Sequence, residues 1–316
     1  MTDRQQGIDR SVVIPFIIFT LIWSATWIVI RDQLGPNSLH SVAPQWSVTY
    51  RFAVAAIAMA AVAKWTGNSL RMDRGGVKAA LIIGFTQFCL NFNSVYLAER
   101  YITSGIVATV FATLLIPNSL LAWAFLGQKP GPRFLAAGAV AVAGIGLLFW
   151  NEVRTSTVPA DHILLGLGLT FVGLWGASIA NVYQAGTEAR RHSLFSLLAW
   201  SMGFGALLDA IIAFTVAGAP TFDPRPGYIA GILYLSLAAS VLAFSLYFPV
   251  VRKLGPGKAA YSSVMVPIFA MALSTAFEGY RWSGLAVAGA VLAIGGMLLA
   301  LLGRRRPLPA TAPDAG

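Results

Sequence analysis

Two stretches decide the fold: residues 117–128, PNSLLAWAFLGQ, and residues 267–278, PIFAMALSTAFE. Each starts with proline, ends with an amide or acid side chain eleven residues later, and is followed by a segment rich in alanine and glycine. A second matched pair lies near the start of each half, LIWSATW at 21–27 and GLWGASI at 173–179. Similar segments about half a chain apart predict two copies of one structural unit.

The composition indicates that the unit is built for a lipid bilayer. Hydrophobic residues make up 57% of the 316 and charged residues only 11%, against about 25% charged in a typical soluble domain. About twenty apolar residues span the hydrocarbon as a helix. Ten segments meet this requirement, with expected limits 12–31, 46–64, 78–98, 102–126, 134–151, 163–185, 194–217, 228–250, 259–278 and 283–302.

Ten segments divided between two copies give five helices in each copy. Because five is odd, the second copy must enter the membrane in the opposite orientation to the first. The sequence therefore predicts an all-α integral membrane protein of ten transmembrane helices, arranged as two inverted five-helix repeats. Their expected limits are 1–151 and 152–316, the second including a short basic tail.

The basic residues predict the topology. With the N-terminus inside, sixteen of the 22 Lys and Arg fall on the cytoplasmic side and six on the opposite side, which places both termini in the cytoplasm. A net charge of +10 would also suit a nucleic-acid-binding protein. That interpretation is disfavoured because the basic residues lie in short clusters between apolar segments rather than on one water-facing surface.

Several short motifs connect the chain to a known family. They are the Trp-Ser-x-x-Trp pattern of the first segment, the Arg51-Phe52 pair, the YLAERY run at 96–101 and the two Pro-x10-Gln/Glu runs. Together they make the chain resemble the drug/metabolite transporter superfamily in its EamA-domain branch, and within it the bacterial amino-acid exporters, including those for aromatic amino acids. The resemblance implies a secondary transporter in the bacterial inner membrane that exports small metabolites by alternating access. One departure is Gln128, where the family commonly has glutamate.

Polar and aromatic side chains within the apolar segments are the candidates for a substrate cavity, because polar groups in a membrane helix usually face the bundle interior. Gln87, Asn91 and Ser94 form one stripe at helical spacing. The alternative for each residue is a structural role, as an interhelical hydrogen bond or a packing contact. The full set of cavity candidates is Trp23, Ser24, Trp27, Gln87, Asn91, Ser94, Trp175, Ser178 and Asn181.

Two prolines are candidates for helix breaks that gate the cavity. Pro117 and Pro267 each lack a backbone donor and leave a carbonyl free one turn earlier. Such breaks act as hinges in some transporters and as simple kinks in other membrane proteins.

Three acids were considered for proton coupling. Asp209 is expected toward the outer end of its segment, where water keeps it ionised, so we predict that it does not couple transport to protons. Glu99 and Glu278 are expected at the water interface, near Arg100 and Arg281.

Other functions find little support in the sequence. Small residues stripe the fifth and tenth segments, which leaves a homodimer and a monomer as equal alternatives. No cofactor, metal or nucleic-acid partner is expected, so the partners are a small-molecule substrate and lipid. The transport alternatives are sugars, nucleotide-linked metabolites or cationic drugs. A membrane-embedded lipid-processing enzyme is a different class, and it would need paired acids or histidines at the headgroup level.

Overall fold

The computed structural model describes residues 10–35, 42–127, 129–155, 159–254, 256–259 and 262–302, and within these ranges every regular element is a helix. Gln128 and both chain ends lie outside them. The elements are α1 (Arg10–Leu34), α2 (Pro44–Trp65), α3 (Arg74–Ile83), η1 (Gly84–Asn91), α4 (Phe92–Ala98), α5 (Ser104–Ala112), α6 (Leu115–Leu126), α7 (Pro132–Thr155), α8 (Ala160–Ala185), α9 (Thr187–Arg190), α10 (Leu194–Ala217), α11 (Pro226–Leu233), η2 (Tyr234–Leu242), α12 (Ala243–Leu254), α13 (Pro256–Ala259), α14 (Ser262–Phe277) and α15 (Gly284–Leu302).

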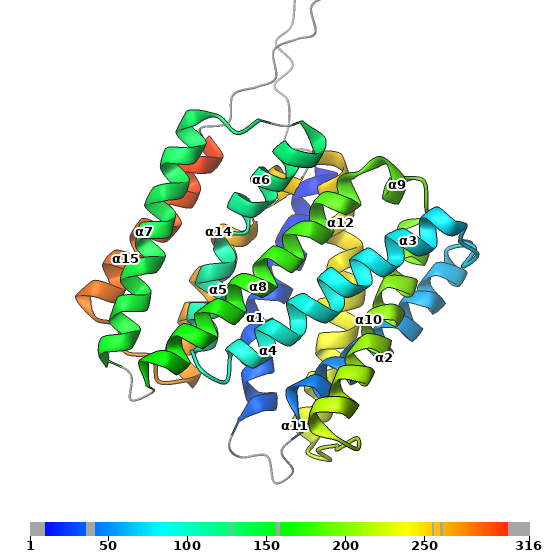
Figure 1. The fold of residues 1–316 in the computed structure, drawn as a ribbon, viewed down its shortest axis with the longest axis horizontal. Coiled ribbons are helices and arrows are strands. Elements are labelled where there is room, and N and C mark those ends of the chain that lie inside the picture. The colour runs from blue at the N-terminus through cyan, green and yellow to red at the C-terminus, as the bar shows by residue number, and fades with distance from the viewer. Residues whose placement is uncertain are drawn as a thin grey trace, which may run out of the picture.

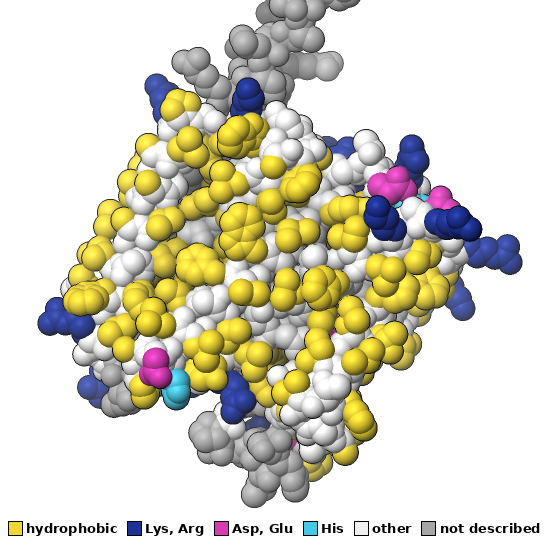
Figure 2. All heavy atoms as spheres, in the orientation of Figure 1, with side chains coloured by type: hydrophobic (Ala, Val, Ile, Leu, Met, Phe, Trp, Pro, Cys, Tyr) yellow, Lys and Arg dark blue, Asp and Glu magenta, His cyan; other side chains and the backbone are white. Residues whose placement is uncertain are grey.

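Eight helical spans in the described part of the chain are long and apolar enough to cross a membrane. Three of them are composite. α3, η1 and α4 run on as one rod, as do α11, η2 and α12, whereas α5 and α6 form one span that is interrupted by a short break. The last two expected segments coincide with α14 and α15, whose apolar parts are shorter, 268–277 and 284–296. Figure 2 shows hydrophobic side chains over the middle of the bundle and Lys and Arg mostly toward its ends, as expected of a multi-pass membrane protein.

Helices about 150 residues apart pair across the bundle. Figure 1 shows α7 alongside α15 at one side and α2 alongside α10 at the other. Between these pairs, α5 packs on α14, α1 packs on η2 and α12, and α8 packs on η1 and α4. The first turn of α1 and the last turn of α15 lie at the same end of the bundle (Figure 1).

The third rod of each half contains a stretch of wide π-helical turns, η1 in the first half and η2 in the second. Both begin after the first few turns of their rod, at Gly84 and Tyr234. Wide turns shift the helical face by one residue and are frequent at functional sites. These turns leave no signature in hydrophobic periodicity, so the sequence does not predict them.

Glycines allow the helices to approach closely around η1. A Cβ on Gly84 would lie 2.7 Å from the carbonyl oxygen of Ser201 in α10, and one on Gly176 would lie 2.7 Å from the carbonyl oxygen of Thr86. Both neighbours are backbone atoms, which cannot rotate away. Helix η1 is therefore held between α8 and α10 at backbone distance.

The small residues of the fifth and tenth segments face each other within one chain. A Cβ on Gly289 would lie 2.8 Å from the carbonyl oxygen of Gly144, and one on Gly296 would lie 2.8 Å from that of Ala137. Close packing of this kind replaces the hydrophobic effect as the force that joins helices in lipid. The stripe is occupied by the α7–α15 contact, so it is not available as a homodimer seam.

The two prolines behave differently. Pro117 lies in the first turn of α6, just after a break at Thr113 and Leu114 that separates α6 from α5. A first-turn proline costs no helical hydrogen bond, because the N–H there has no intrahelical partner. Pro267 lies within α14, which continues as one helix from Ser262 to Phe277. The break expected at each proline is therefore found at Pro117 and not at Pro267 in the described residues.

Candidate functional site

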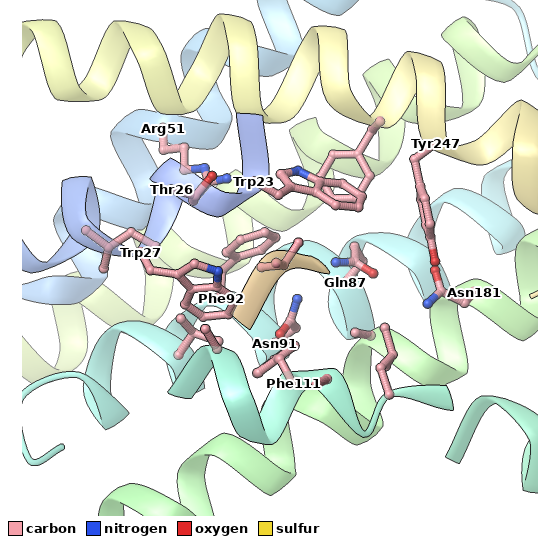
Figure 3. A pocket seen from close by; sticks show the side chains of 18 residues that line it. Trp23, Thr26, Trp27, Arg51, Gln87, Asn91, Phe92, Phe111, Asn181 and Tyr247 are labelled. Carbon is pink, nitrogen blue, oxygen red and sulfur yellow. The ribbon is translucent and has the colours of Figure 1, made fainter. Parts of the chain in front are cut away.

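A cavity of about 120 Å³ lies where the two halves of the chain meet. It is bounded by α1, α2, η1, α4, α5 and α8 on several sides and by α12 and α14 from the end of the chain. The lining residues are Trp23, Thr26, Trp27, Ile30, Arg51, Gln87, Asn91, Phe92, Val95, Ala108, Phe111, Ala112, Leu114, Ala177, Asn181, Phe244, Tyr247 and Val266. Figure 3 shows their side chains around the space.

Six of the eighteen lining residues are aromatic. The Trp23 ring lies 4.9 Å from that of Tyr247 and 5.3 Å from that of Phe244, both in edge-to-face arrangements. The Trp23 indole nitrogen donates to the carbonyl oxygen of Ala239 at 3.0 Å. Trp27 contacts Phe111 with a centroid separation of 5.3 Å. These contacts fix the rings before any ligand enters, so the wall is preorganised.

Three amides project into this aromatic space. Gln87 and Asn91 come from η1, one turn apart, and Asn181 comes from α8 (Figure 3). The side-chain oxygens of Asn91 and Asn181 are buried and have no hydrogen-bond partner among the described residues. A buried unpaired polar atom costs about 1–3 kcal/mol. Asn91 Oδ1 lies against Gly173 of α8, which leaves the Asn91 amide nitrogen facing the cavity (Figure 3).

Arg51 is the only charged side chain in the described lining. It is fully buried, and its Nε donates to Ser240 Oγ at 3.1 Å. The guanidinium carbon lies 4.3 Å from the centre of the Phe92 ring and 5.1 Å from that of Phe52. Arg51 is not among the cavity residues expected from the sequence, although an arginine inside an apolar segment is a visible signal of a functional site.

Five of the nine cavity candidates line the cavity: Trp23, Trp27, Gln87, Asn91 and Asn181. Four do not: Ser24, Ser94, Ser178 and Trp175. The three serines are buried in helix contacts, and the Ser24 hydroxyl donates to the carbonyl oxygen of Thr20.

Trp175 is a correction to the expected site. Its side chain is 42% exposed and lies on the outer surface of the bundle. The reason is local, because Gly173 and Gly176 take the inward face of α8. A Cβ on Gly173 would lie 3.0 Å from the carbonyl oxygen of Asn91. The helices are so close there that a bulky side chain fits only on the far side of α8.

Asp209 also differs from expectation. It was expected to be reached by water, but its side chain is fully buried between α10 and α4. Its Oδ1 accepts a hydrogen bond from Asn93 Nδ2 at 2.6 Å, while Oδ2 has no partner in the described part of the chain. The premise that Asp209 is solvent-exposed is therefore wrong.

Glu99 and Glu278 are buried too, and Arg31 is their basic neighbour instead of Arg100 or Arg281. Arg31 donates to the backbone carbonyl of Glu99, and its Nε lies 4.0 Å from Glu278 Oε1. Glu278 Oε2 accepts from the Ser104 amide at 3.2 Å. Burial raises the pKa of Glu99 well above its ordinary value, and nearby Glu278 raises it further while Arg31 lowers it.

One group of described residues has the side-chain types that bind metals. His192 Nε2 lies 3.5 Å from Asp73 Oδ1 and 3.8 Å from Glu188 Oε1. This group was not predicted from the sequence, because Asp73 is far along the chain from Glu188 and His192. Asp73 also caps α3 by accepting from the Gly76 amide. The group ties α3 to α9 and lies outside the cavity.

The fold and site together define a multi-pass helical membrane protein with a small, mostly apolar cavity between two halves. The EamA-like transporter family matches the chain twice, over residues 10–150 and 162–302. The chain belongs to that family, which confirms the resemblance recognised from the motifs. Two copies of the family unit fit the pairing of helices across the bundle.

Individual relatives are distant but match over nearly their whole length. Protein PagO of Salmonella typhimurium is 23% identical over 311 residues, covering 96% of this chain and 97% of PagO. The probable amino-acid metabolite efflux pump of Escherichia coli K12 is 22% identical, covering 92% of this chain and 94% of the pump. A solved crystal structure superposes with a TM-score of 0.66 at 15% identity, over 94% of this chain and 98% of the other.

Proposed function

We propose that this protein is a secondary transporter that exports small metabolites, most of all amino acids and among them the aromatic ones. The observation that carries the proposal is the cavity between the two halves, with its fixed aromatic wall and unpaired amide oxygens. Apolar walls suit a hydrophobic side chain, and a few polar groups suit a charged head. The name of the Escherichia coli relative, an amino-acid metabolite efflux pump, points to the same substrate class.

The proposed mechanism is alternating access by two inverted repeats, residues 1–151 and 152–316, with ten transmembrane helices in all. Three observations support it: the family matches twice, helices 150 residues apart pair, and wide turns occur in the third rod of both halves. A cavity between two similar units opens to one side or the other when the units rock.

The alternative substrates suit this lining less well. No carboxylate is among the described cavity residues, so a cationic drug would find no counter-charge. A nucleotide-linked metabolite calls for several basic groups, and the described lining contains only Arg51. Sugars need many hydrogen-bonding partners, which a mostly apolar wall does not supply. Membership of a transporter family argues against a lipid-processing enzyme.

The function is tested by loading proteoliposomes that contain the purified protein with single radiolabelled compounds. The panel comprises aromatic, aliphatic and polar amino acids, a hexose, a nucleotide sugar and a quaternary ammonium dye. We expect efflux of at least one amino acid to exceed that from protein-free liposomes by tenfold or more. Efflux confined to the sugar, the nucleotide sugar or the dye would reject the amino-acid assignment.

We further propose that the protein lies in the bacterial inner membrane with both termini in the cytoplasm, on the sixteen-to-six distribution of Lys and Arg. The expected result is that Gln5→Cys and Ala312→Cys variants resist a membrane-impermeant thiol reagent in intact cells and react after lysis. Cys89 is buried, so the native background should be low. Labelling of either position in intact cells would reverse the topology.

A further inference from the structure

Arg51 is a buried cation whose charge is not balanced within the described part of the chain. No ion pair involves it, and its Nη1 and Nη2 atoms have no hydrogen-bond partner there. The titratable groups that act on it are the phenols of Tyr96 and Tyr234, and the Tyr96 oxygen lies within reach of the guanidinium without meeting hydrogen-bond geometry. Both hydroxyls donate elsewhere, to Gln33 Oε1 and to the carbonyl oxygen of Ile22. A neutral phenol cannot balance a guanidinium charge.

The surroundings of Arg51 hold its guanidinium in place. Nε donates to Ser240 Oγ, and Ser236 Oγ in turn donates to the Arg51 carbonyl oxygen at 2.9 Å. Both serines belong to η2, where Ser240 Oγ also donates to the carbonyl oxygen of Leu235, five residues back. The Phe92 ring covers one face of the guanidinium. With Nε anchored and one face covered, the remaining donors are the two terminal nitrogens, and Arg51 lines the cavity.

Burial of such a charge without a partner costs several kcal/mol. Protein chains rarely retain an uncompensated buried arginine unless it has a function, and a planar guanidinium with two free terminal nitrogens matches the two oxygens of a carboxylate. Stacking on Phe92 and Phe52 offsets part of the cost but leaves the hydrogen-bonding capacity unused.

Other unpaired polar atoms lie around the cavity together with Arg51. Trp27 Nε1 is a buried donor without a partner among the described residues. In Figure 3, Arg51 and Trp27 lie toward one side of the cavity, Asn181 and Tyr247 lie toward the opposite side, and Asn91 lies between them. Asn91 Oδ1 lies against Gly173 of α8, and the amide nitrogen faces the cavity, where it is a further donor suited to a carboxylate.

We propose that Arg51 is the substrate's carboxylate-binding residue, assisted by Trp27, so that the transported class is monocarboxylates with an apolar body. A zwitterionic amino acid with an apolar side chain belongs to this class. The inference rests on the transport function proposed above and restricts the expected substrates to compounds that carry a carboxylate.

The test compares free acids with their carboxamides, which have nearly the same shape but no negative charge. Purified full-length protein in lipid nanodiscs is titrated calorimetrically with L-phenylalanine and L-phenylalaninamide, L-leucine and L-leucinamide, and 3-phenylpropionate and its amide. We expect at least one acid to bind about tenfold or more tightly than its amide, because a charge-assisted bidentate contact is lost. If every acid binds no better than its amide, the inference is overturned.

Substitutions test whether Arg51 causes the tighter binding of acids than of amides. Arg51→Gln should abolish the acid-over-amide preference, Arg51→Lys should retain part of it, and Arg191→Gln, an exposed charge change outside the cavity, should retain all of it. If Arg51→Gln elutes as an aggregate, the test relies on Arg51→Lys, whose acid-over-amide preference is compared with that of the wild type. A lysine variant with an undiminished preference would overturn the bidentate assignment. An Arg51→Gln variant that folds and keeps the preference would also overturn it.

The two proposals fail in distinguishable ways. If Arg51→Gln exports amino acids from proteoliposomes at the wild-type rate, the carboxylate assignment is wrong and the transport function stands. If 3-phenylpropionate binds in an Arg51-dependent manner but no amino acid is exported, the amino-acid assignment is wrong and the carboxylate site stands.

Discussion

Gly144→Leu should prevent α7 from seating against α15 and should leave little correctly folded protein. A Cβ at this position would lie 2.6 Å from the carbonyl oxygen of Gly289 and 2.9 Å from the Cα of Ala293. These are backbone atoms of α15, so the helices themselves must separate. Overpacking in a well-packed core costs about 1–3 kcal/mol, and more where backbone must move. The thermal midpoint in detergent should fall by about ten degrees or more, as measured by the scattering onset.

The matched control is on the same helix. A Cβ at Gly146 would meet nothing within 4 Å, and this glycine is exposed on the outer side of α7. Gly146→Leu should therefore express, elute and melt much as the wild type, because leucine is as compatible with lipid tails as with a helix. Equal behaviour of the two leucine variants would show that α7 and α15 are not packed at backbone distance.

Trp23→Ala should reduce export at least tenfold, while Trp175→Ala should remain within about twofold of the wild-type rate. The two tryptophans occupy similar motifs in the two halves, but Trp23 lines the cavity and Trp175 faces outward. Loss of Trp23 removes the ring between Phe244 and Tyr247 and the hydrogen bond to the Ala239 carbonyl oxygen. The measurement is initial efflux of whichever amino acid the proteoliposome panel identifies.

A folding defect must be separated from a binding defect, because truncating a packed tryptophan costs about 3–5 kcal/mol. Trp23→Phe keeps an aromatic ring against Phe244 and Tyr247 and loses only the indole donor, so it should fold and should retain more transport than Trp23→Ala. If Trp23→Ala, verified as monodisperse, exports as fast as Trp175→Ala, the cavity is not on the substrate path.

The sequence by itself determined the membrane character, the positions of the apolar spans and the family. These properties depend on local features: a span is long and apolar or it is not, and the paired motifs at 117–128 and 267–278 are read directly along the chain. Five of the residues that line the cavity were predictable for the same reason. Gln87, Asn91 and Asn181 are amides in apolar segments, and such groups avoid lipid whatever their neighbours are.

Only the tertiary structure decided which face of each helix turns inward. Trp23 and Trp175 have similar local sequences, yet glycines bring α8 so close to η1 that Trp175 is left outside. Asp209 became a buried partner of Asn93 because α10 lies against the rod that carries Asn93. In the same way, Arg51 became a cavity residue because the wide turns of η2 present Ser236 and Ser240 to it. Each outcome depends on interhelical distance and on the rotation of a helix about its axis, and hydrophobic periodicity within one nearly uniformly apolar segment specifies neither.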